Sequence, residues 1–184
     1  MNVANIITLG RLLSVPLFLW LLVHGNTAAA FWLFFAAAVS DAVDGFVARR
    51  FGMQTTLGEF LDPIADKTLL VSAYVTLGSM EMLPIWIVIP VVSRDALIVG
   101  GALLIKKLTR DLRMEPILIS RANTLLQSSL VLLVLLPSVF ASPVGHVVTL
   151  LSFAVLVTTL VSGGAYVYIW SMRADNFEGP NGES

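Results

Sequence analysis

The stretch that decides the fold is "AAAFWLFFAAAVSDAVDGFVARR", Ala28–Arg50. Its first thirteen residues carry no charge; then Asp41 and Asp44 follow at a spacing of three, with two arginines beyond them. A long apolar run is typical of a helix that crosses a membrane, which needs about 20 mostly apolar residues. Residues three apart share one face of a helix, so the two carboxylates are expected together near the end of this span.

The composition of the whole chain also favours a membrane protein. Of its 184 residues, 57% are hydrophobic and 12% are charged, whereas an ordinary soluble domain has about 25% charged residues. The net charge of −1 gives no indication of a nucleic-acid partner. With no cysteine, the chain cannot form disulfides or thiolate metal sites. We therefore expect the lipid bilayer to be its solvent.

Similar apolar segments recur along the chain, separated by residues that favour turns. The sequence predicts an all-α fold, an integral membrane bundle of six transmembrane helices over residues 1–173, followed by a polar, disordered tail at 174–184. The start lacks a basic leader and a cleavage site, so we expect a retained first helix. The predicted spans are Ile6–Val23, Ala28–Ala48, Leu57–Ser79, Pro84–Ile105, Ile117–Leu136 and Val147–Trp170.

Basic residues predict the orientation of this bundle. Loops on one side hold no lysine or arginine, whereas those on the other side are rich in both. By the positive-inside rule the basic side faces the cytoplasm, and with six spans both termini do as well. The basic residues in the loops after the second and fourth spans are Arg49, Arg50, Lys106, Lys107, Arg110 and Arg113.

A second acidic pair lies in "LGEFLDPIADK", where Asp62 and Asp66 are four residues apart and share a face of the third span. The short connection makes the second and third spans antiparallel neighbours, so all four carboxylates can converge. Two unit charges 4 Å apart repel by roughly 4 kcal/mol even at an effective dielectric constant of 20. The possible remedies are protonation, pairing with arginine, or divalent cations, and oxygen ligands with room for phosphate suit Mg²⁺ or Mn²⁺.

Neighbouring residues favour a site for phosphate and metal. Gly45 and Gly58 have no side chain, so a ligand can approach the backbone closely, and the planar fork of Arg49 suits phosphate oxygens. A single aspartate near the end of a span is more often an ordinary interfacial residue, but packing does not explain the whole combination. Glycines elsewhere in the apolar helices are interpreted as packing contacts, namely Gly100, Gly101, Gly163 and Gly164.

The pattern D-x-x-D-G-x-x-A-R, followed after eight residues by G-x-x-x-D-x-x-x-D, resembles the signature of the CDP-alcohol phosphatidyltransferases. That resemblance extends over almost the whole chain and implies six transmembrane helices, a homodimer, and transfer of a phosphatidyl group from CDP-diacylglycerol to an alcohol with release of CMP. It also implies a bacterial inner-membrane protein whose active site faces the cytoplasm. The signature is matched by Asp41, Asp44, Gly45, Ala48, Arg49, Gly58, Asp62 and Asp66.

The resemblance also implies a role for each signature residue. Asp41, Asp44 and Asp62 would bind divalent metal, Mg²⁺ or Mn²⁺ and two ions in all, on the pyrophosphate. Asp66 would complete the metal site and act as the catalytic base toward the attacking hydroxyl. The residues expected to border CDP-diacylglycerol are Gly45, Ala48, Arg49 and Gly58.

Charged residues outside the signature bear on the acceptor. Arg94 and Asp95 lie well inside the fourth span, where charge is expensive and usually functional. Adjacent helical residues do not face each other, so their partners are expected on other helices. The candidates for binding the acceptor are Arg94, Arg113 and Arg121, although for Arg113 an ordinary positive-inside loop is the simpler interpretation. The residues expected on one inward face of the fifth span are Ser120, Asn123 and Gln127.

Local resemblance bears on which alcohol is used. "LDPIADK" (61–67) is similar to the branch with glycerol-based acceptors, and "SRD", "ISRANTLLQ" and "TTLVSGGAYVY" are closer to eukaryotic-type cardiolipin synthases. These motifs favour phosphatidylglycerol, with glycerol-3-phosphate as the alternative. An ion-coupled transporter is a further alternative, against which stand the lack of an inverted repeat and the position of the aspartates at one edge. A purely structural bundle would leave the acidic cluster unexplained.

Overall fold

The structure is a computed structural model. It describes the backbone of residues 3–51, 56–109, 118–140 and 144–175, and the side chains of residues 10–40, 67–101, 119–140 and 144–168.

The described residues form helices and turns, without a strand, so the predicted all-α class is confirmed. Six long helices coincide with the six predicted segments, and a single helical turn precedes the last of them. The helices are α1 (Val3–Val23), α2 (Thr27–Phe51), α3 (Thr56–Ser79), α4 (Ile85–Thr109), α5 (Leu118–Leu135), α6 (Pro137–Phe140) and α7 (Gly145–Asp175).

Several helices continue beyond the predicted apolar segments. α2 includes Arg49 and Arg50, and α4 includes Lys106 and Lys107. Arginine and lysine are good helix formers, so the backbone hydrogen bonds continue where the apolar run stops. The short helix α6 was not predicted, because four residues are too few to show a helical periodicity.

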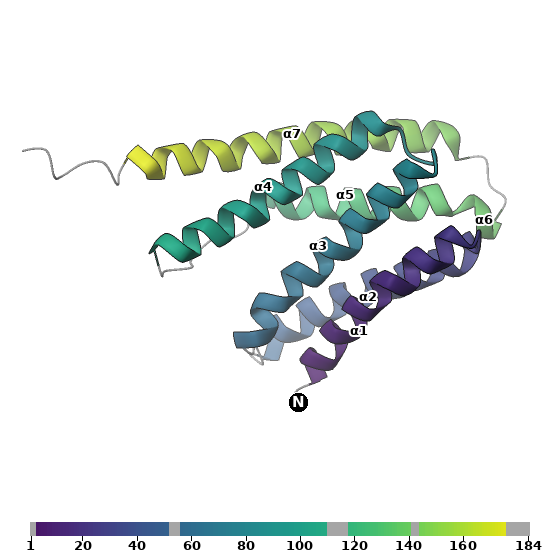
Figure 1. Ribbon diagram of the computed structural model, residues 1–184, viewed down its shortest axis with the longest axis horizontal. Coiled ribbons are helices and arrows are strands. Elements are labelled where there is room, and N and C mark those ends of the chain that lie inside the picture. The colour runs from purple at the N-terminus through teal and green to yellow at the C-terminus, as the bar shows by residue number, and fades with distance from the viewer. Residues whose placement is uncertain (1–2, 52–55, 110–117, 141–143, 176–184) are drawn as a thin grey trace, which may run out of the picture.

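The long helices alternate in direction and form a bundle (Figure 1). α1 packs against α2 and α3, α3 against α4, and α7 against both α4 and α5. The N-terminal ends of α1, α3 and α5 and the C-terminal ends of α2, α4 and α7 lie at one end of the bundle, at the left and lower left of Figure 1. We call this end, which carries Phe51, Thr56, Thr109 and Leu118, the signature end.

Two tight turns close the opposite end. Gly25, with a φ of 74°, lies two residues beyond the end of α1, and Glu81, with a φ of 58°, lies two residues beyond the end of α3. In both turns the next amide reaches back five residues, from Asn26 N to Leu21 O and from Met82 N to Leu77 O, each at 2.9 Å. This is the Schellman arrangement, which satisfies the last carbonyls of a helix.

The α3–α4 hairpin is tightest near its turn. A Cβ atom added to Gly78 would lie 2.8 Å from Cγ2 of Val88, closer than any real contact of this kind. Glycine therefore lets the two helices touch at this level. From this contact the helices diverge toward the signature end (Figure 1).

The core is apolar, but so is much of the outer surface. Phe18, Leu22 and Leu77 are fully buried, whereas Leu125 and Leu150 are 68% and 74% exposed. Soluble proteins rarely expose so many large apolar side chains together. Such a surface suits contact with lipid.

Two segments of the described residues are long and apolar enough to cross a membrane, Ile119–Phe140 and Gly145–Tyr168. Two shorter apolar segments, Gly10–Val23 and Thr27–Ser40, belong to α1 and α2. These findings cover part of the predicted set of six spans. The predicted tail at 174–184 begins within α7, which continues to Asp175, and its other residues lie outside the described part of the chain.

Candidate active site at the signature end

The backbone brings the two acidic pairs to the same end of the bundle. Asp41 lies about ten residues before the end of α2, and Asp66 lies about ten residues after the start of α3. At 1.5 Å per residue, both are roughly 15 Å from the signature end of their helices. Asp44 and Asp62 are each about one turn closer to that end.

The side chains of the signature lie outside those that the structure describes, so the convergence of the four carboxylates stays a prediction. The same holds for Gly45, Ala48, Arg49 and Gly58, which lie on α2 and α3 with the aspartates. The predicted acceptor residue Arg113 is likewise outside the described residues. Elsewhere, among the described side chains, no three of His, Asp and Glu gather as a metal site.

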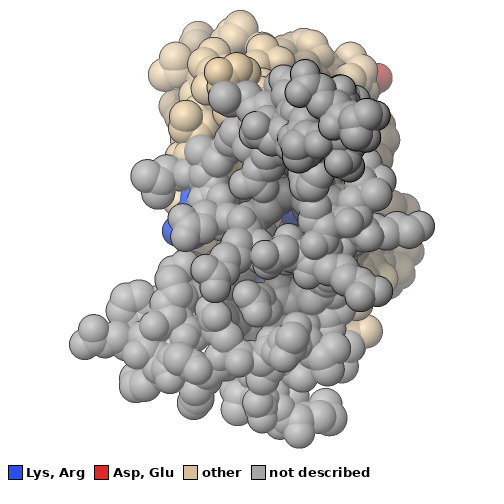
Figure 2. All heavy atoms as spheres, turned by 90° about the vertical axis from the view of Figure 1, so that its left-hand side faces the viewer, with Lys and Arg blue, Asp and Glu red and all other residues tan. Residues whose placement is uncertain are grey.

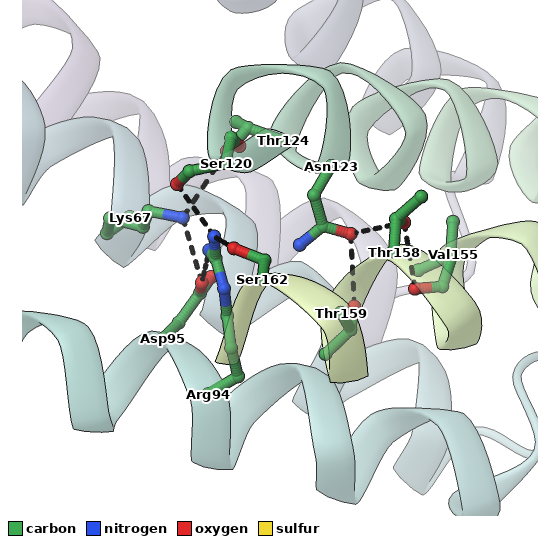
Figure 3. A network of polar contacts seen from close by, with 10 residues as sticks. All are labelled: Lys67, Arg94, Asp95, Ser120, Asn123, Thr124, Val155, Thr158, Thr159 and Ser162. Carbon is green, nitrogen blue, oxygen red and sulfur yellow. Dashed lines mark hydrogen bonds and ion pairs between the residues drawn. The ribbon is translucent and has the colours of Figure 1, made fainter. Parts of the chain in front are cut away.

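A buried polar network begins one residue beyond Asp66 (Figure 3). Nζ of Lys67 on α3 donates to Oδ1 of Asp95 on α4 at 2.8 Å and lies 3.5 Å from Oγ1 of Thr124 on α5. The side chain of Lys67 is 17% exposed and that of Asp95 1%. The network therefore fixes the part of α3 that follows Asp66 against α4 and α5.

Arg94 extends this network to the last helix. Its Nη1 donates to Oδ1 of Asp95 at 2.6 Å, and its Nη2 donates to Oγ of Ser120 on α5 at 2.7 Å and to Oγ of Ser162 on α7 at 2.5 Å. The side chain is 4% exposed. Its two terminal nitrogens thus link three helices, and the contacts they make are with protein side chains.

The expectation about the partners of these charges is confirmed, and one further contact was not expected. We expected Arg94 and Asp95 to find partners on other helices, because neighbouring Cβ atoms point in different directions. Arg94 bonds to Ser120 and Ser162, and Asp95 bonds to Lys67. The two side chains in fact pair with each other as well. The arginine side chain is long enough to curve back to the adjacent carboxylate. Because both groups are buried and lose their hydration, pairing with each other is favourable.

The inward face predicted for α5 is confirmed. Asn123 and Gln127 are fully buried. Oδ1 of Asn123 accepts from Oγ1 of Thr158 at 2.8 Å and from Oγ1 of Thr159 at 3.0 Å, both on α7 (Figure 3). These bonds hold α5 and α7 together just beyond the charged network.

Arg121 differs from the other described candidates because its side chain is exposed. The preceding residue, Ser120, turns inward to Arg94. Arg121 therefore lies on a different face of α5 from the network. Figure 2 looks onto the signature end, where Lys and Arg atoms of described residues show between the grey ones.

Sequence reasoning missed three polar residues of this region. Lys67 was noticed only as part of a motif, and Ser162 only as part of the last span. Arg11 on α1, which is 5% exposed, was passed over. A charge inside an apolar span was the available signal for Arg11 and Lys67, whereas a serine carries no comparable signal.

Four glycines were interpreted as packing contacts; the interpretation holds at Gly163, fails at two others, and stays a prediction at Gly101. A Cβ on Gly163 would lie 3.5 Å from Cγ of Arg94, an ordinary van der Waals distance, so this glycine packs against the arginine stem. At Gly100 and Gly164 an added Cβ would meet no atom within 4 Å. The predicted packing contacts at these two positions are therefore wrong within the chain.

Comparison with known proteins defines the class of this protein. The sequence model of the CDP-alcohol phosphatidyltransferases matches residues 1–162, a range that includes the whole acidic signature. The chain belongs to the CDP-alcohol phosphatidyltransferase family.

Its relatives carry the names of two activities. The chain is 31% identical, over 185 aligned positions, to a CDP-diacylglycerol–glycerol-3-phosphate 3-phosphatidyltransferase of rice chloroplasts, covering 90% of this chain and 56% of the relative. It is 44% identical over 100 positions to a probable phosphatidylglycerophosphate synthase of Mycobacterium tuberculosis, covering 51% of this chain and 48% of the relative. It is 31% identical over 177 positions to a cardiolipin synthase (CMP-forming)/mitochondrial hydrolase fusion protein of Schizosaccharomyces pombe, covering 88% of this chain and 30% of the relative. The chain thus spans about half the length, or less, of these curated relatives.

Proposed function

We propose that the protein transfers the phosphatidyl group of CDP-diacylglycerol to a glycerol-type alcohol and releases CMP. The observation that carries this proposal is the complete acidic signature inside the family match, with both aspartate pairs at one level of the same bundle end. Two relatives that align with about nine-tenths of the chain are named as a CDP-diacylglycerol–glycerol-3-phosphate 3-phosphatidyltransferase and a cardiolipin synthase (CMP-forming) fusion protein.

The chemistry needs a leaving group, a nucleophile and a base. The acceptor hydroxyl oxygen forms a bond to the phosphorus of the phosphatidyl group, and the bond from this phosphorus to the bridging pyrophosphate oxygen breaks. CMP leaves with that oxygen. The hydroxyl proton passes to the carboxylate of Asp66, which acts as the base.

Divalent cations fit the donor set of this site. Asp41, Asp44, Asp62 and Asp66 would supply hard oxygen ligands from two helices that reach the same level, which suits Mg²⁺ or Mn²⁺, two ions in all. When bound, these ions neutralise the negative charge of the pyrophosphate. Gly45, Ala48, Arg49 and Gly58 would border the nucleotide and its phosphates.

For the acceptor we favour phosphatidylglycerol, which makes the protein a cardiolipin synthase. A lipid acceptor needs a second opening toward the bilayer beside the site, and a pocket between α3 and α4 lies next to Lys67. The alternative, glycerol-3-phosphate, needs only a basic pocket open to the cytosol, which Arg113 and Arg121 would provide. Because Arg94 uses its terminal nitrogens on Asp95, Ser120 and Ser162, we assign it the positioning of helices.

The membrane arrangement follows the charge pattern. We place six spans in the bilayer, with the signature end and both termini in the cytoplasm. The exposed apolar side chains on the outer helices support this placement. A homodimer in a bacterial inner membrane is part of the same proposal.

The test supplies purified full-length protein with labelled CDP-diacylglycerol, Mg²⁺ and each acceptor separately. Phosphatidylglycerol should yield cardiolipin and CMP in equal amounts. A lipid product from glycerol-3-phosphate alone would replace the cardiolipin assignment with phosphatidylglycerophosphate synthesis. No CMP with either acceptor would contradict the proposed function.

A further inference from the structure

A groove lies between α3 and α4 on the side of the bundle. It has a volume of about 280 Å³, and its walls are mainly apolar, with Val71 on α3 facing Val92, Ala96 and Val99 on α4. The helices touch at Gly78 and Val88 and diverge from there toward the signature end (Figure 1). The groove is therefore a gap in the wall of the bundle at the level where the helices have separated.

Lys67 and Asp95 are the charged residues that line this groove, and Thr68 and Ser72 add two hydroxyl groups. Lys67 directly follows Asp66, and the two Cα atoms of adjacent residues are 3.8 Å apart. The groove therefore begins one residue beyond the proposed base along α3.

The described polar network beside the groove carries a net positive charge. Within the described network, Lys67 and Arg94 carry two positive charges and Asp95 carries one negative charge, and both cations share the same oxygen, Oδ1. An ammonium has three N–H donors, and the described contacts of Lys67 are with Asp95 and Thr124. An anion beside Lys67 would balance the remaining positive charge of this network.

We propose that the groove between α3 and α4 binds an anionic phospholipid, with its phosphodiester at Nζ of Lys67 and an acyl chain along Val71, Val92 and Val99. This inference rests on the proposed function, in which such a lipid is the acceptor. A charged atom at one end and apolar walls along the rest match the two parts of a phospholipid. A small water-soluble phosphate would leave the apolar walls without a partner.

The absence of cysteine from the chain allows a direct test of binding. Ala96→Cys places a single thiol in the groove, and Leu97→Cys places one on the neighbouring residue, which is 39% exposed and does not line the groove. The full-length variants are reconstituted in vesicles of phosphatidylcholine, with or without phosphatidylglycerol. The rate of modification by a membrane-permeant maleimide is then measured.

Phosphatidylglycerol should slow the modification of Ala96→Cys by about tenfold. This factor corresponds to the lower end of the free-energy range for one hydrogen bond to a charged group. It should leave Leu97→Cys unchanged. Adding Lys67→Met should abolish the protection, because methionine keeps the length of the side chain and loses the charge. Equal rates for Ala96→Cys in both lipids, or a disulfide-linked Ala96→Cys dimer in both, would overturn the inference, the latter by placing a second copy on the groove.

Turnover provides the second measurement. Lys67→Met should raise the KM for phosphatidylglycerol by about tenfold and leave the KM for CDP-diacylglycerol unchanged. If the wild-type protein makes cardiolipin but neither protection nor this KM depends on Lys67, the groove inference fails and the proposed function stands. If the protein releases no CMP but the protection is observed, the proposed function fails and the lipid site stands.

Discussion

The carboxylate of Asp95 holds the described polar network together, because its Oδ1 atom accepts from both Lys67 and Arg94. A buried charge is tolerated when it is paired, and removing one partner leaves the other uncompensated. The network joins α3, α4, α5 and α7 one residue away from Asp66. A residue-scale change here should therefore affect both the stability of the bundle and the position of the proposed base.

Arg94→Met should lower the free energy of unfolding by about 3 kcal/mol, the typical cost of breaking a buried ion pair. Asp95→Asn should be similarly destabilising, because it leaves two buried cations. The double variant should lose less than the sum of the two, because the same interaction is removed in each. Thermal unfolding of the purified proteins in detergent measures this, and strictly additive losses would show that the pair is not coupled.

The proposed division of work among the aspartates predicts different defects. Asp66→Asn should abolish CMP release and leave binding of CDP-diacylglycerol largely intact, because it removes the base and one of several metal ligands. Asp41→Asn should weaken binding of CDP-diacylglycerol as well. Binding is measured directly with labelled CDP-diacylglycerol, and equal loss in both variants would argue against a separate base.

At the scale of the helices, the sequence predicted most of the fold. Apolar runs separated by turn residues predicted the positions of all six long helices. In lipid a helix must make all its backbone hydrogen bonds internally, and its side chains are apolar all around, so each helix appears as a continuous apolar run. The predicted helices stopped too early at their charged ends, because Arg49 and Lys106 continue a helix although they are not apolar. The one-turn helix α6 depends on local backbone geometry that an apolar pattern does not record.

The site was less predictable, because its partners are set by packing. The inward face of α5 followed from helical spacing and is confirmed at Asn123 and Gln127. The bond from Arg94 to Ser162 joins residues 68 positions apart, and no local pattern specifies it. The same limit applies to Gly78, whose close contact with Val88 depends on how α3 meets α4.

Gly78→Ala tests this helix contact. The added methyl group would lie 2.8 Å from Val88 Cγ2, and valine is stiff at χ1, so the helices must move apart. The variant should lose roughly 1–2 kcal/mol of stability, a typical cost of overpacking. In a Val88→Ala background the same change should be neutral or stabilising, because alanine is the better helix former. Destabilisation by Gly78→Ala of the same size in both backgrounds, seen by thermal unfolding, would show that the contact does not limit the hairpin.

At the scale of the whole molecule, one end of the bundle combines the features that the proposed phosphatidyl transfer requires. Both aspartate pairs lie at one level of α2 and α3. The groove between α3 and α4 begins at Lys67, the residue after Asp66. The outer faces of the helices are apolar. A lipid donor and a lipid acceptor could then reach one site while remaining in the bilayer.

Metal dependence of CMP release tests the central claim most directly. The four carboxylates at 41, 44, 62 and 66 are proposed to act through divalent cations, because carboxylate oxygens are ligands that suit Mg²⁺ or Mn²⁺. Purified full-length protein is given CDP-diacylglycerol and phosphatidylglycerol, and CMP is measured with excess EDTA and again after Mg²⁺ or Mn²⁺ is added back. CMP release should vanish with EDTA and return with either ion, whereas full release in excess EDTA would contradict a metal-dependent transfer at the acidic signature.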